Sequence, residues 1–253
     1  MKQKAKILLI DIETSPNLSY IWGQYEQNAL SIERNWYIMS FSAKWLGGKQ
    51  ITKCLSDYPG YKPLQENDER IMKDIWELLD KAQVVVAHNG DKFDIKKINT
   101  RFIKNGMTPP SPYKQIDTLK VAKKYFAFSS NKLDDLGEFL GIGRKLEHEG
   151  FPLWQKCMRG EKKSWRKMKR YNVQDTKLLE KVYLELRGWD NRHPNLGLYH
   201  EEVVCPKCGS PNIHWRGYQY NRTTKYKRFQ CQDCHGWGRS PTREKIIRPL
   251  VNV

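Results

Sequence analysis

The sequence predicts an α/β fold in which a β-sheet is flanked by helices, followed by a small metal-binding domain. Three observations predict this architecture. Apolar runs with the length of buried strands alternate with segments of helical periodicity over the first 187 residues. Four of the six cysteines form two CxxC pairs near the C-terminus. A chain of 253 residues is long enough for one full domain and a small second one.

The predicted strands lie mostly in the first part of the chain. Residues 5–10 form a continuous apolar run bounded by charge, which is typical of a strand buried on both faces. Alternation over residues 37–45 predicts a second strand, and residues 49–55 supply a third. The apolar segment 83–89 predicts another buried strand between two helices. The order is therefore mostly β, then α, β and α.

Five segments show helical periodicity, and they cover residues 69–82, 93–106, 117–128, 132–143 and 168–186. Asn67 or Asp68 is expected to cap the first helix. Gly106 is expected to end the second as a C-cap glycine. The remaining helix caps are expected at Asp117, Asp134 and Asp135.

A change in composition divides the chain. Residues 1–187 are expected to form the main domain and residues 188–202 a linker. Residues 203–238 would form the small metal-binding domain, and residues 239–253 a basic tail. The stretch 203–253 contains ten Lys or Arg against only two acidic residues, so positive charge is concentrated in it.

The overall charge indicates a polyanionic partner. Lys and Arg number 45 against 28 Asp and Glu, a formal net charge of +17, and aromatic residues make up 12%. Such a basic and aromatic-rich chain most often binds nucleic acid. No apolar run approaches the roughly 20 residues of a membrane span, and the N-terminal residues do not resemble a secretory signal. We therefore expect an intracellular protein without a membrane partner, which is cytoplasmic if it comes from a prokaryote or from a virus of a prokaryotic host. The sequence identifies no protein partner.

Four acidic residues and a tyrosine are predicted to converge. Asp11 and Glu13 lie two apart at the end of the first strand, so both carboxylates project from one side. Asp94 stands at a strand-to-helix junction, and Tyr171 lies one helical turn before Asp175. Converging acids would repel one another, whereas Mg²⁺ or Mn²⁺ prefers oxygen ligands and neutralises their charge. The sequence predicts a site for two such ions.

Three motifs around these residues resemble a known family. DIET at 11–14, NGDKFD at 89–94 and YNVQD at 171–175, with helices between them, resemble the motifs of the DEDD 3′-5′ exonuclease superfamily. NGDKFD is especially similar to the middle motif of proofreading domains in family B DNA polymerases. The resemblance covers residues 5–187 and implies an RNase H-like fold, with a mixed sheet flanked by helices. The superfamily has two branches, one with a tyrosine four positions before the last aspartate and one with a histidine five positions before it. Here Tyr171 holds the first position and Arg170 the second, so the sequence resembles the tyrosine branch, DEDDy.

The resemblance also implies an activity, the hydrolysis of phosphodiester bonds from a 3′ end by a two-metal mechanism. It implies that Asp11, Glu13 and Asp175 hold one ion. Asp11 would bridge to the second ion, which Asp94 supports directly or through water. Tyr171 would orient the attacking water rather than act as a base, because an unperturbed tyrosine pKa near 10 leaves little phenolate at neutral pH. Asn89 is expected to contact the nucleic-acid strand or the turn of its own motif.

Each acid also has a structural interpretation. Asp94 alone can be a helix cap, Asp175 a solvated helix residue and Glu13 a strand-end charge. The joint order of the motifs favours the metal site over these alternatives. His88 is expected to be a structural histidine or a substrate contact rather than a metal ligand.

Four cysteines predict a zinc ribbon. The pairs Cys205–Cys208 and Cys231–Cys234 are separated by 22 residues, and each CxxC turn can present two thiolates to one ion. Four sulfur ligands leave no open position, so one structural Zn²⁺ is expected. A disulfide pairing is the alternative, which the intracellular location disfavours. The other two cysteines, Cys54 and Cys157, are expected to be unpaired buried thiols.

Two basic segments are expected to contact nucleic acid. Between the cysteine pairs, cations that can meet phosphates alternate with aromatic rings that can stack on bases. The expected contacts there are Trp215, Arg216, Tyr218, Arg222, Lys225, Lys227 and Arg228. The alternative is that the rings build the core of the ribbon. The second segment, residues 156–170, has eight basic residues and is expected to guide the strand through Arg166, Lys167 and Arg170, or else to be a solvated helix face.

Together these features predict a stand-alone metal-dependent 3′-5′ exonuclease, with DNA favoured over RNA as substrate and the ribbon anchoring it. An exoribonuclease or a structure-selective nuclease on the same fold remains open. So does a binding adaptor that no longer cuts, although all four carboxylates and the tyrosine are present. A transposase-like enzyme is disfavoured because the core has no separate DNA-binding domain ahead of it.

Overall fold

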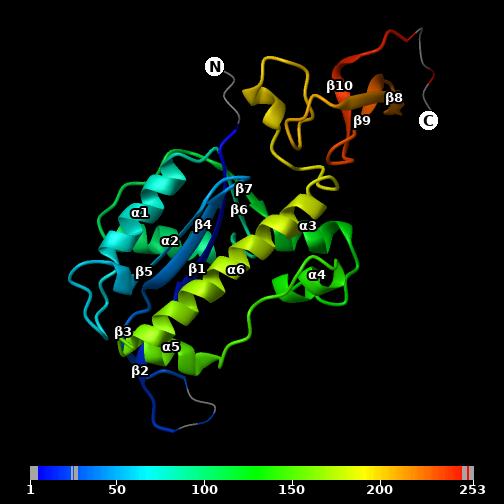
Figure 1. Cartoon of the computed structure of the whole chain (residues 1–253). Helices are drawn as coiled ribbons and strands as arrows, with labels where there is room; N and C mark the ends of the chain where they lie inside the picture. The colour runs from blue at the N-terminus through cyan, green and yellow to red at the C-terminus, as the bar shows by residue number, and fades with distance from the viewer. Residues whose placement is uncertain (1–4, 24, 26–27, 247–249, 251–253) are drawn as a thin grey trace.

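The computed structural model of the protein describes residues 5–23, 25, 28–246 and 250, and Figure 1 shows the whole chain. The strands are β1 (Ile7–Thr14), β2 (Leu18–Tyr20), β3 (Ser31–Arg34), β4 (Ile38–Trp45), β5 (Gln50–Cys54), β6 (Val84–Ala87), β7 (Lys114–Asp117), β8 (Ile213–Tyr220), β9 (Lys225–Cys231) and β10 (Trp237–Arg243). The helices are α1 (Glu69–Asp80), α2 (Asp94–Lys104), α3 (Thr118–Tyr125), α4 (Leu133–Phe139), α5 (Phe151–Met158) and α6 (Lys162–Leu186), with short 3₁₀ turns at Leu55–Asp57 and Leu196–Tyr199.

The main sheet has five strands in the order β5-β4-β1-β6-β7. β1 pairs antiparallel with β4 and parallel with β6, so the sheet is mixed. β4 pairs antiparallel with β5, and β6 pairs parallel with β7. The α/β class and the mixed sheet flanked by helices are therefore confirmed, and the central strand is the one with the longest apolar run.

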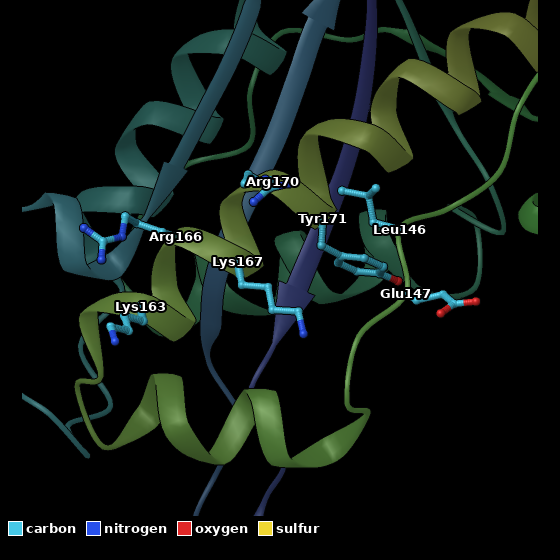
Figure 2. A pocket seen from close by; sticks show the side chains of 7 residues that line it. All are labelled: Leu146, Glu147, Lys163, Arg166, Lys167, Arg170 and Tyr171. Carbon is cyan, nitrogen blue, oxygen red and sulfur yellow. The ribbon is translucent and has the colours of Figure 1, made fainter.

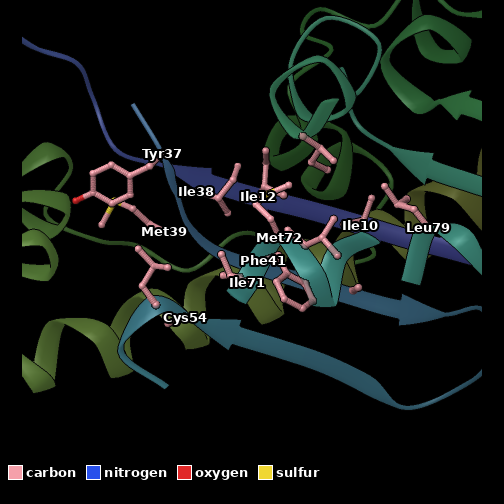
Figure 3. Close-up of a cluster of buried hydrophobic side chains, with 14 of the residues drawn as sticks. Ile10, Ile12, Tyr37, Ile38, Met39, Phe41, Cys54, Ile71, Met72 and Leu79 are labelled. Carbon is pink, nitrogen blue, oxygen red and sulfur yellow. The ribbon is translucent and has the colours of Figure 1, made fainter. Parts of the chain in front are cut away.

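The two faces of β1 pack into different clusters. Leu8, Ile10 and Ile12 face a cluster that includes apolar residues of α1 and α2, part of which Figure 3 shows. Ile7 and Leu9 face a second cluster, formed with α3, α4 and the C-terminal half of α6. Because successive strand residues alternate, Asp11 and Glu13 continue the face of Ile7 and Leu9 and point toward α6. This alternation places the acids of β1 opposite those of the long helix.

Helix α6 is the longest element, with 25 residues, and it crosses the sheet in Figure 1. It begins at Lys162, six residues before the predicted start at residue 168, because its first turns bury Trp165 and Met168 against the end of the α1 and α2 cluster. α5 and β7 were not predicted. Each is short, and the KQID sequence of β7 is polar; it is a strand because it pairs with β6 at the sheet edge.

Some predicted caps have other roles. Asp68 precedes α1 but does not cap it; its buried carboxylate accepts from Arg101 Nε at 2.7 Å and from the backbone N–H of Ile38 at 3.0 Å. The salt bridge is favoured over capping because a buried carboxylate without a cation would cost free energy. Asp135 accepts from the Ser130 hydroxyl, and the N-cap position of α4 is Lys132. Asp117 does cap α3, accepting from the backbone N–H groups of the helix's first turn.

The small C-terminal sheet has the order β10-β9-β8 and lies beyond the C-terminal end of α6 (Figure 1). The segment expected as a linker makes specific contacts: the Tyr183 hydroxyl and His193 Nε2 are 2.9 Å apart, and Lys207 Nζ donates to the Gly188 carbonyl at 2.6 Å.

The expected boundary between residues 238 and 239 falls inside β10. Of the expected basic tail, residues 247–249 and 251–253 lie outside the described residues. In the part of the chain that the structure describes, no helix has the length and apolar character of a membrane span.

Candidate metal and nucleic-acid site

Three carboxylates from two distant segments meet between β1 and α6. Asp11 and Glu13 on β1 and Asp175 on α6 each offer an oxygen, and these atoms all lie within 4.8 Å of one another. Asp175 is almost fully buried, whereas Asp11 and Glu13 remain partly accessible. The two carboxylates of β1 are therefore the more accessible members of the cluster, and Asp175 is the deepest.

The fourth predicted acid, Asp94, lies beside this cluster at the first position of α2. Its Oδ1 accepts from the backbone N–H of Ile12 at 3.1 Å, which ties α2 to β1 between the two acids of the strand. Asp94 is buried, and its charge acts strongly on Asp11. Asp94 is thus adjacent to Asp11, although it is not one of the three residues whose oxygens form the close group.

Burial makes the ionised form of all four acids costly. It raises the pKa of Asp11 well above its ordinary value, and the charges of Asp94 and Glu13 add to this effect. Burial, followed by the charge of Asp175, raises the pKa of Glu13 to about 8. Burial raises the pKa of Asp94 to about 7, against the hydrogen bond from Ile12. Burial also raises the pKa of Asp175, against the influence of Lys145. Without added cations, the cluster favours bound protons.

Lys145, which the sequence analysis did not single out, reaches into this cluster. Its Nζ donates to Asp175 Oδ2 at 2.6 Å and lies 3.3 Å from the Tyr171 hydroxyl. Although burial opposes its charge, the attraction of Asp175 and other acidic groups raises the pKa of Lys145. Asp134, predicted as a helix cap, instead accepts from the backbone N–H of Lys145 at 2.6 Å and fixes the segment in place. Local sequence gave no sign of this role, because the contact joins residues 30 apart.

Tyr171 and Asn172 line the helix side of the site. Burial and the charge of Asp175 raise the pKa of Tyr171, so its hydroxyl is a neutral donor at physiological pH. The Asn172 side-chain amide donates to Asp11 Oδ2 at 2.5 Å, and its oxygen accepts from the Ser40 hydroxyl at 3.1 Å. Asn172 therefore holds Asp11 in position. Its neighbour in the YNVQD motif was recognised, but Asn172 itself was missed.

The turn that carries Asn89 is built for close packing. Asn89 has a positive φ of 64°, and its backbone N–H donates to Asp117 Oδ1 at 2.9 Å. A Cβ on the next residue, Gly90, would lie 2.5 Å from the Cβ of Ala87, so the turn requires glycine there. His88 contacts the Thr118 hydroxyl at 2.8 Å and the Asn131 carbonyl at 3.0 Å, in agreement with the structural alternative for this residue. The Asn89 side chain makes no hydrogen bond within the described residues.

The donor set suits hard divalent cations. Asp175 Oδ1 is buried and has no hydrogen-bond partner, which is costly for a carboxylate unless a cation binds it. The four predicted acids offer oxygen ligands only, the preference of Mg²⁺ and Mn²⁺. Lys145 supplies one positive charge to a group that carries up to four negative charges. The cluster therefore fits a cation site.

The four cysteines of the C-terminal domain form a second group. Their sulfurs lie within 4.8 Å of one another, with Sγ–Sγ separations of 3.6 Å for both Cys205–Cys234 and Cys208–Cys231. Sulfur ligands about 2.3 Å from a tetrahedral Zn²⁺ would be about 3.8 Å apart, whereas a disulfide needs about 2.05 Å. The arrangement fits zinc and excludes these disulfides. All six cysteines are free, and Cys54 and Cys157 are buried, as predicted.

The expected nucleic-acid contacts of the ribbon differ in exposure. Phe229 is buried and Trp215 packs edge-on against it, 5.4 Å between ring centroids, so these rings build a small core as the alternative predicted. Lys225 lies over the Tyr218 ring at 3.9 Å, and Arg228 lies 4.6 Å from the centroid of Trp237. Four of the expected contacts are exposed cations on strands β8 and β9 or their turn: Arg216, Arg222, Lys227 and Arg228.

The second basic segment, residues 156–170, spans the end of α5 and the first turns of α6. Arg166, Lys167 and Arg170 are exposed on α6 and line a hollow of about 430 Å³ beside Tyr171 and Leu146, shown in Figure 2. The structure therefore places these predicted contacts next to the acid cluster but on the outer side of α6.

Comparison with known proteins agrees with this geometry. Residues 8–187 match the family model described as the RNase H superfamily. A solved structure titled as the family B DNA polymerase from the hyperthermophilic archaeon Pyrobaculum calidifontis is similar to this chain, with a TM-score of 0.50 and 12% sequence identity. The similarity covers 87% of this chain but only 32% of the polymerase, and at this identity it supports the fold alone. Comparison with curated proteins gives no match.

Proposed function

This chain belongs to the RNase H superfamily, and on that premise we propose that it is a metal-dependent 3′-5′ exonuclease of the DEDDy type that hydrolyses DNA. One observation supports this most strongly. Carboxylates from β1, α2 and α6 gather in one place, where one buried oxygen of Asp175 has no partner. In a purely structural set of acids, this oxygen of Asp175 would also have a hydrogen-bond donor.

The acids divide into two groups that would hold two ions. Asp11, Glu13 and Asp175 would bind one ion, and Asp11 together with Asp94 would bind the other. A pair of Mg²⁺ or Mn²⁺ ions supplies an activated water and charge stabilisation for the leaving 3′-oxygen. The neutral Tyr171 hydroxyl is suited to orient that water by donating or accepting a hydrogen bond. Asn172 keeps Asp11 from rotating away.

The ribbon is proposed to hold one structural Zn²⁺ through Cys205, Cys208, Cys231 and Cys234 and to increase affinity for the substrate. The exposed cations on β8 and β9 can contact phosphates. Closed four-sulfur coordination leaves no place for a substrate on the metal. The ribbon is therefore proposed to bind the substrate, and the acid cluster to hydrolyse it.

The proposal is tested by digesting DNA and RNA strands that carry a label at the 3′ or the 5′ end, with protein dialysed free of Mg²⁺ and Mn²⁺ and then titrated with each ion. We expect mononucleotide release from 3′-labelled DNA only when Mg²⁺ or Mn²⁺ is present. With a 5′ label, the labelled products should form a ladder of fragments that become shorter from the 3′ end. Faster digestion of RNA would favour the exoribonuclease alternative, and tight binding without cleavage would favour the adaptor.

A further inference from the structure

The outer face of α6 has a row of cations without acidic partners. Lys163, Arg166, Arg170 and Lys177 are exposed, and among the described residues none of them has an ion pair or a hydrogen bond. Two neighbours on the helix do have partners, since Lys167 pairs with Glu149 and Lys169 with Asp57. Unpaired cations at this spacing leave a concentrated positive charge along about four turns of helix.

The row lines two adjoining surface hollows. One of about 430 Å³ is lined by Lys163, Arg166 and Arg170, and a shallower one of about 470 Å³ is lined by Arg166, Arg170 and Lys177. The two share Leu146, Arg166 and Arg170, so they adjoin each other. Figure 2 shows the first hollow, with the cationic side chains on α6 and Leu146 and Glu147 on the segment opposite.

The row and the acid cluster lie on different sides of the same helix. Arg170 and Asp175 are five positions apart, which at 3.6 residues per turn separates their directions by about 140°. The segment before α5 separates the two surfaces, because the Lys145 side chain reaches Asp175 while the next residue, Leu146, lines the hollow. A strand whose terminal phosphate reached Asp175 would have to cross Tyr171 and Leu146 to contact Arg170. The row is thus placed for a different strand.

The chemistry of the row fits a nucleic-acid backbone rather than unstacked bases. Sites for single strands combine cations with exposed aromatic rings. Tyr171 is the one aromatic residue that lines either hollow, and its ring already packs against His148, 4.6 Å between centroids, and against Trp154 at 6.3 Å. No free ring is available there to stack on a base, whereas the guanidinium and ammonium groups can meet phosphates.

From this placement we infer that the outer face of α6 binds the sugar-phosphate backbone of a second nucleic-acid strand, so that the substrate is the 3′ end of a duplex. The inference rests on the proposed function, since it assigns the acid cluster to the first strand. From Lys163 to Lys177 the helix rises about 21 Å, the length of about 6 base pairs. Contacts of this kind are independent of base sequence.

The test compares two triple variants on two substrates. Lys163→Gln, Arg166→Gln and Arg170→Gln together remove three charges from the row. Lys81→Gln, Lys96→Gln and Lys104→Gln together remove three exposed charges from α2 and the end of α1, away from α6. Binding of a fluorescein-labelled blunt DNA duplex and of the matching single strand is followed by anisotropy between 50 and 200 mM NaCl, without Mg²⁺ or Mn²⁺.

We expect the α6 variant to lose at least tenfold more affinity for the duplex than for the single strand. Its salt dependence on duplex should decrease in slope by about 2.7, since each phosphate contact contributes about 0.9. The control variant should change both affinities by less than about twofold. Equal losses on both substrates would overturn the inference, because the row would then hold the scissile strand, and so would an unchanged duplex affinity.

Digestion of 3′-labelled single strands by the unmodified protein is measured in parallel with Mn²⁺. If nothing is digested while the α6 variant still loses duplex affinity selectively, the proposed activity fails, but duplex binding by the outer face of α6 stands. If digestion proceeds but the duplex affinity does not depend on the row, the proposed activity stands and the second-strand site is wrong. The two ideas are therefore tested separately, and thermal unfolding of each variant shows that both remain folded.

Discussion

The acid cluster and the cysteine cluster are both candidate metal sites, but the chain builds them in different ways. The cysteines come from two short turns, their sulfurs are already at near-tetrahedral separations, and no ligand position is open. The acids come from three elements that only the complete fold brings together, and one of their buried oxygens lacks a partner. We therefore expect the cysteine site to help to form its domain, whereas the acid site depends on a domain that is already formed.

The largest expected effect is on activity when an acid is removed. Asp11→Ala and Asp175→Ala should each lower the rate of DNA digestion by about 10³-fold, because several kcal/mol of charge stabilisation are lost with the metal. Asp11→Ala should not unfold the core, since it relieves repulsion in the cluster. Asp175→Ala also removes the partner of Lys145, so it should lower the melting temperature more than Asp11→Ala does. The measurement is single-turnover digestion of 3′-labelled DNA, together with thermal unfolding.

Glu77→Ala is the matched control for these variants, because it removes an exposed carboxylate on α1. It should leave the digestion rate within about twofold of the unmodified protein. Full activity in either acid variant would contradict the proposal that the acid cluster is the catalytic metal site.

The next largest effect concerns the cysteine site. Cys205→Ser should abolish zinc binding and unfold the small sheet, because structural zinc in such domains contributes about 10 kcal/mol or more. The main domain should remain folded, since none of the four cysteines belongs to either of its core clusters. Zinc content by metal analysis and limited proteolysis of residues 203–243 test both statements. Affinity for DNA should decrease while the digestion rate at saturating DNA is retained.

Cys54→Ala serves as the control for cysteine loss. Cys54 is buried in the main core, so its removal should lower the stability of that domain and leave the zinc content unchanged. If Cys205→Ser instead destroyed the main domain, the two metal sites would not be independent in the way that their construction indicates.

Tyr171→Phe should have a smaller effect. The substitution retains the ring that packs against His148 and removes only the hydroxyl beside Lys145. Loss of one orienting hydrogen bond to water corresponds to about 10- to 100-fold in kcat, at about 1.5–3 kcal/mol. KM should stay within a few-fold of its original value. An increase in KM without a change in kcat would indicate instead that the tyrosine binds substrate.

The two regions also differ in how far sequence could predict them. The CxxC spacing already identifies the four cysteines that the structure brings together, because each pair is a local turn. The acids were found through motif order, and the alternation of β1 accounts for Asp11 and Glu13 on one face. Lys145 and Asn172 were missed because their roles arise from contacts between residues far apart in sequence. Asp68 was misassigned for the same reason, since its partner Arg101 lies on another helix.

The smallest expected effect is the loss of stability with rising pH that the acid cluster contributes. Folding raises the pKa of Glu13 from 4.5 to about 8 and that of Asp94 from 3.8 to about 7, mainly through burial. A carboxyl group whose pKa is higher in the folded chain stabilises the fold below its unfolded value, and this contribution is lost as pH rises through the folded value. The melting temperature of the metal-free protein should therefore decrease between about pH 5 and pH 8.

Divalent cations should reverse this trend, because they bind the ionised carboxylates and displace protons. Mn²⁺ should raise the melting temperature by about 3 to 6 °C at pH 8 and by less than about 1 °C at pH 5. Scanning calorimetry with and without Mn²⁺ measures the difference, and Asp11→Asn should reduce it. Zinc should remain bound throughout, so the C-terminal sheet contributes equally to both scans. An Mn²⁺ effect of equal size at both pH values would mean that the four acids do not bind protons in the metal-free state. The acid site would then not differ from the sulfur site by carrying protons that a metal ion displaces.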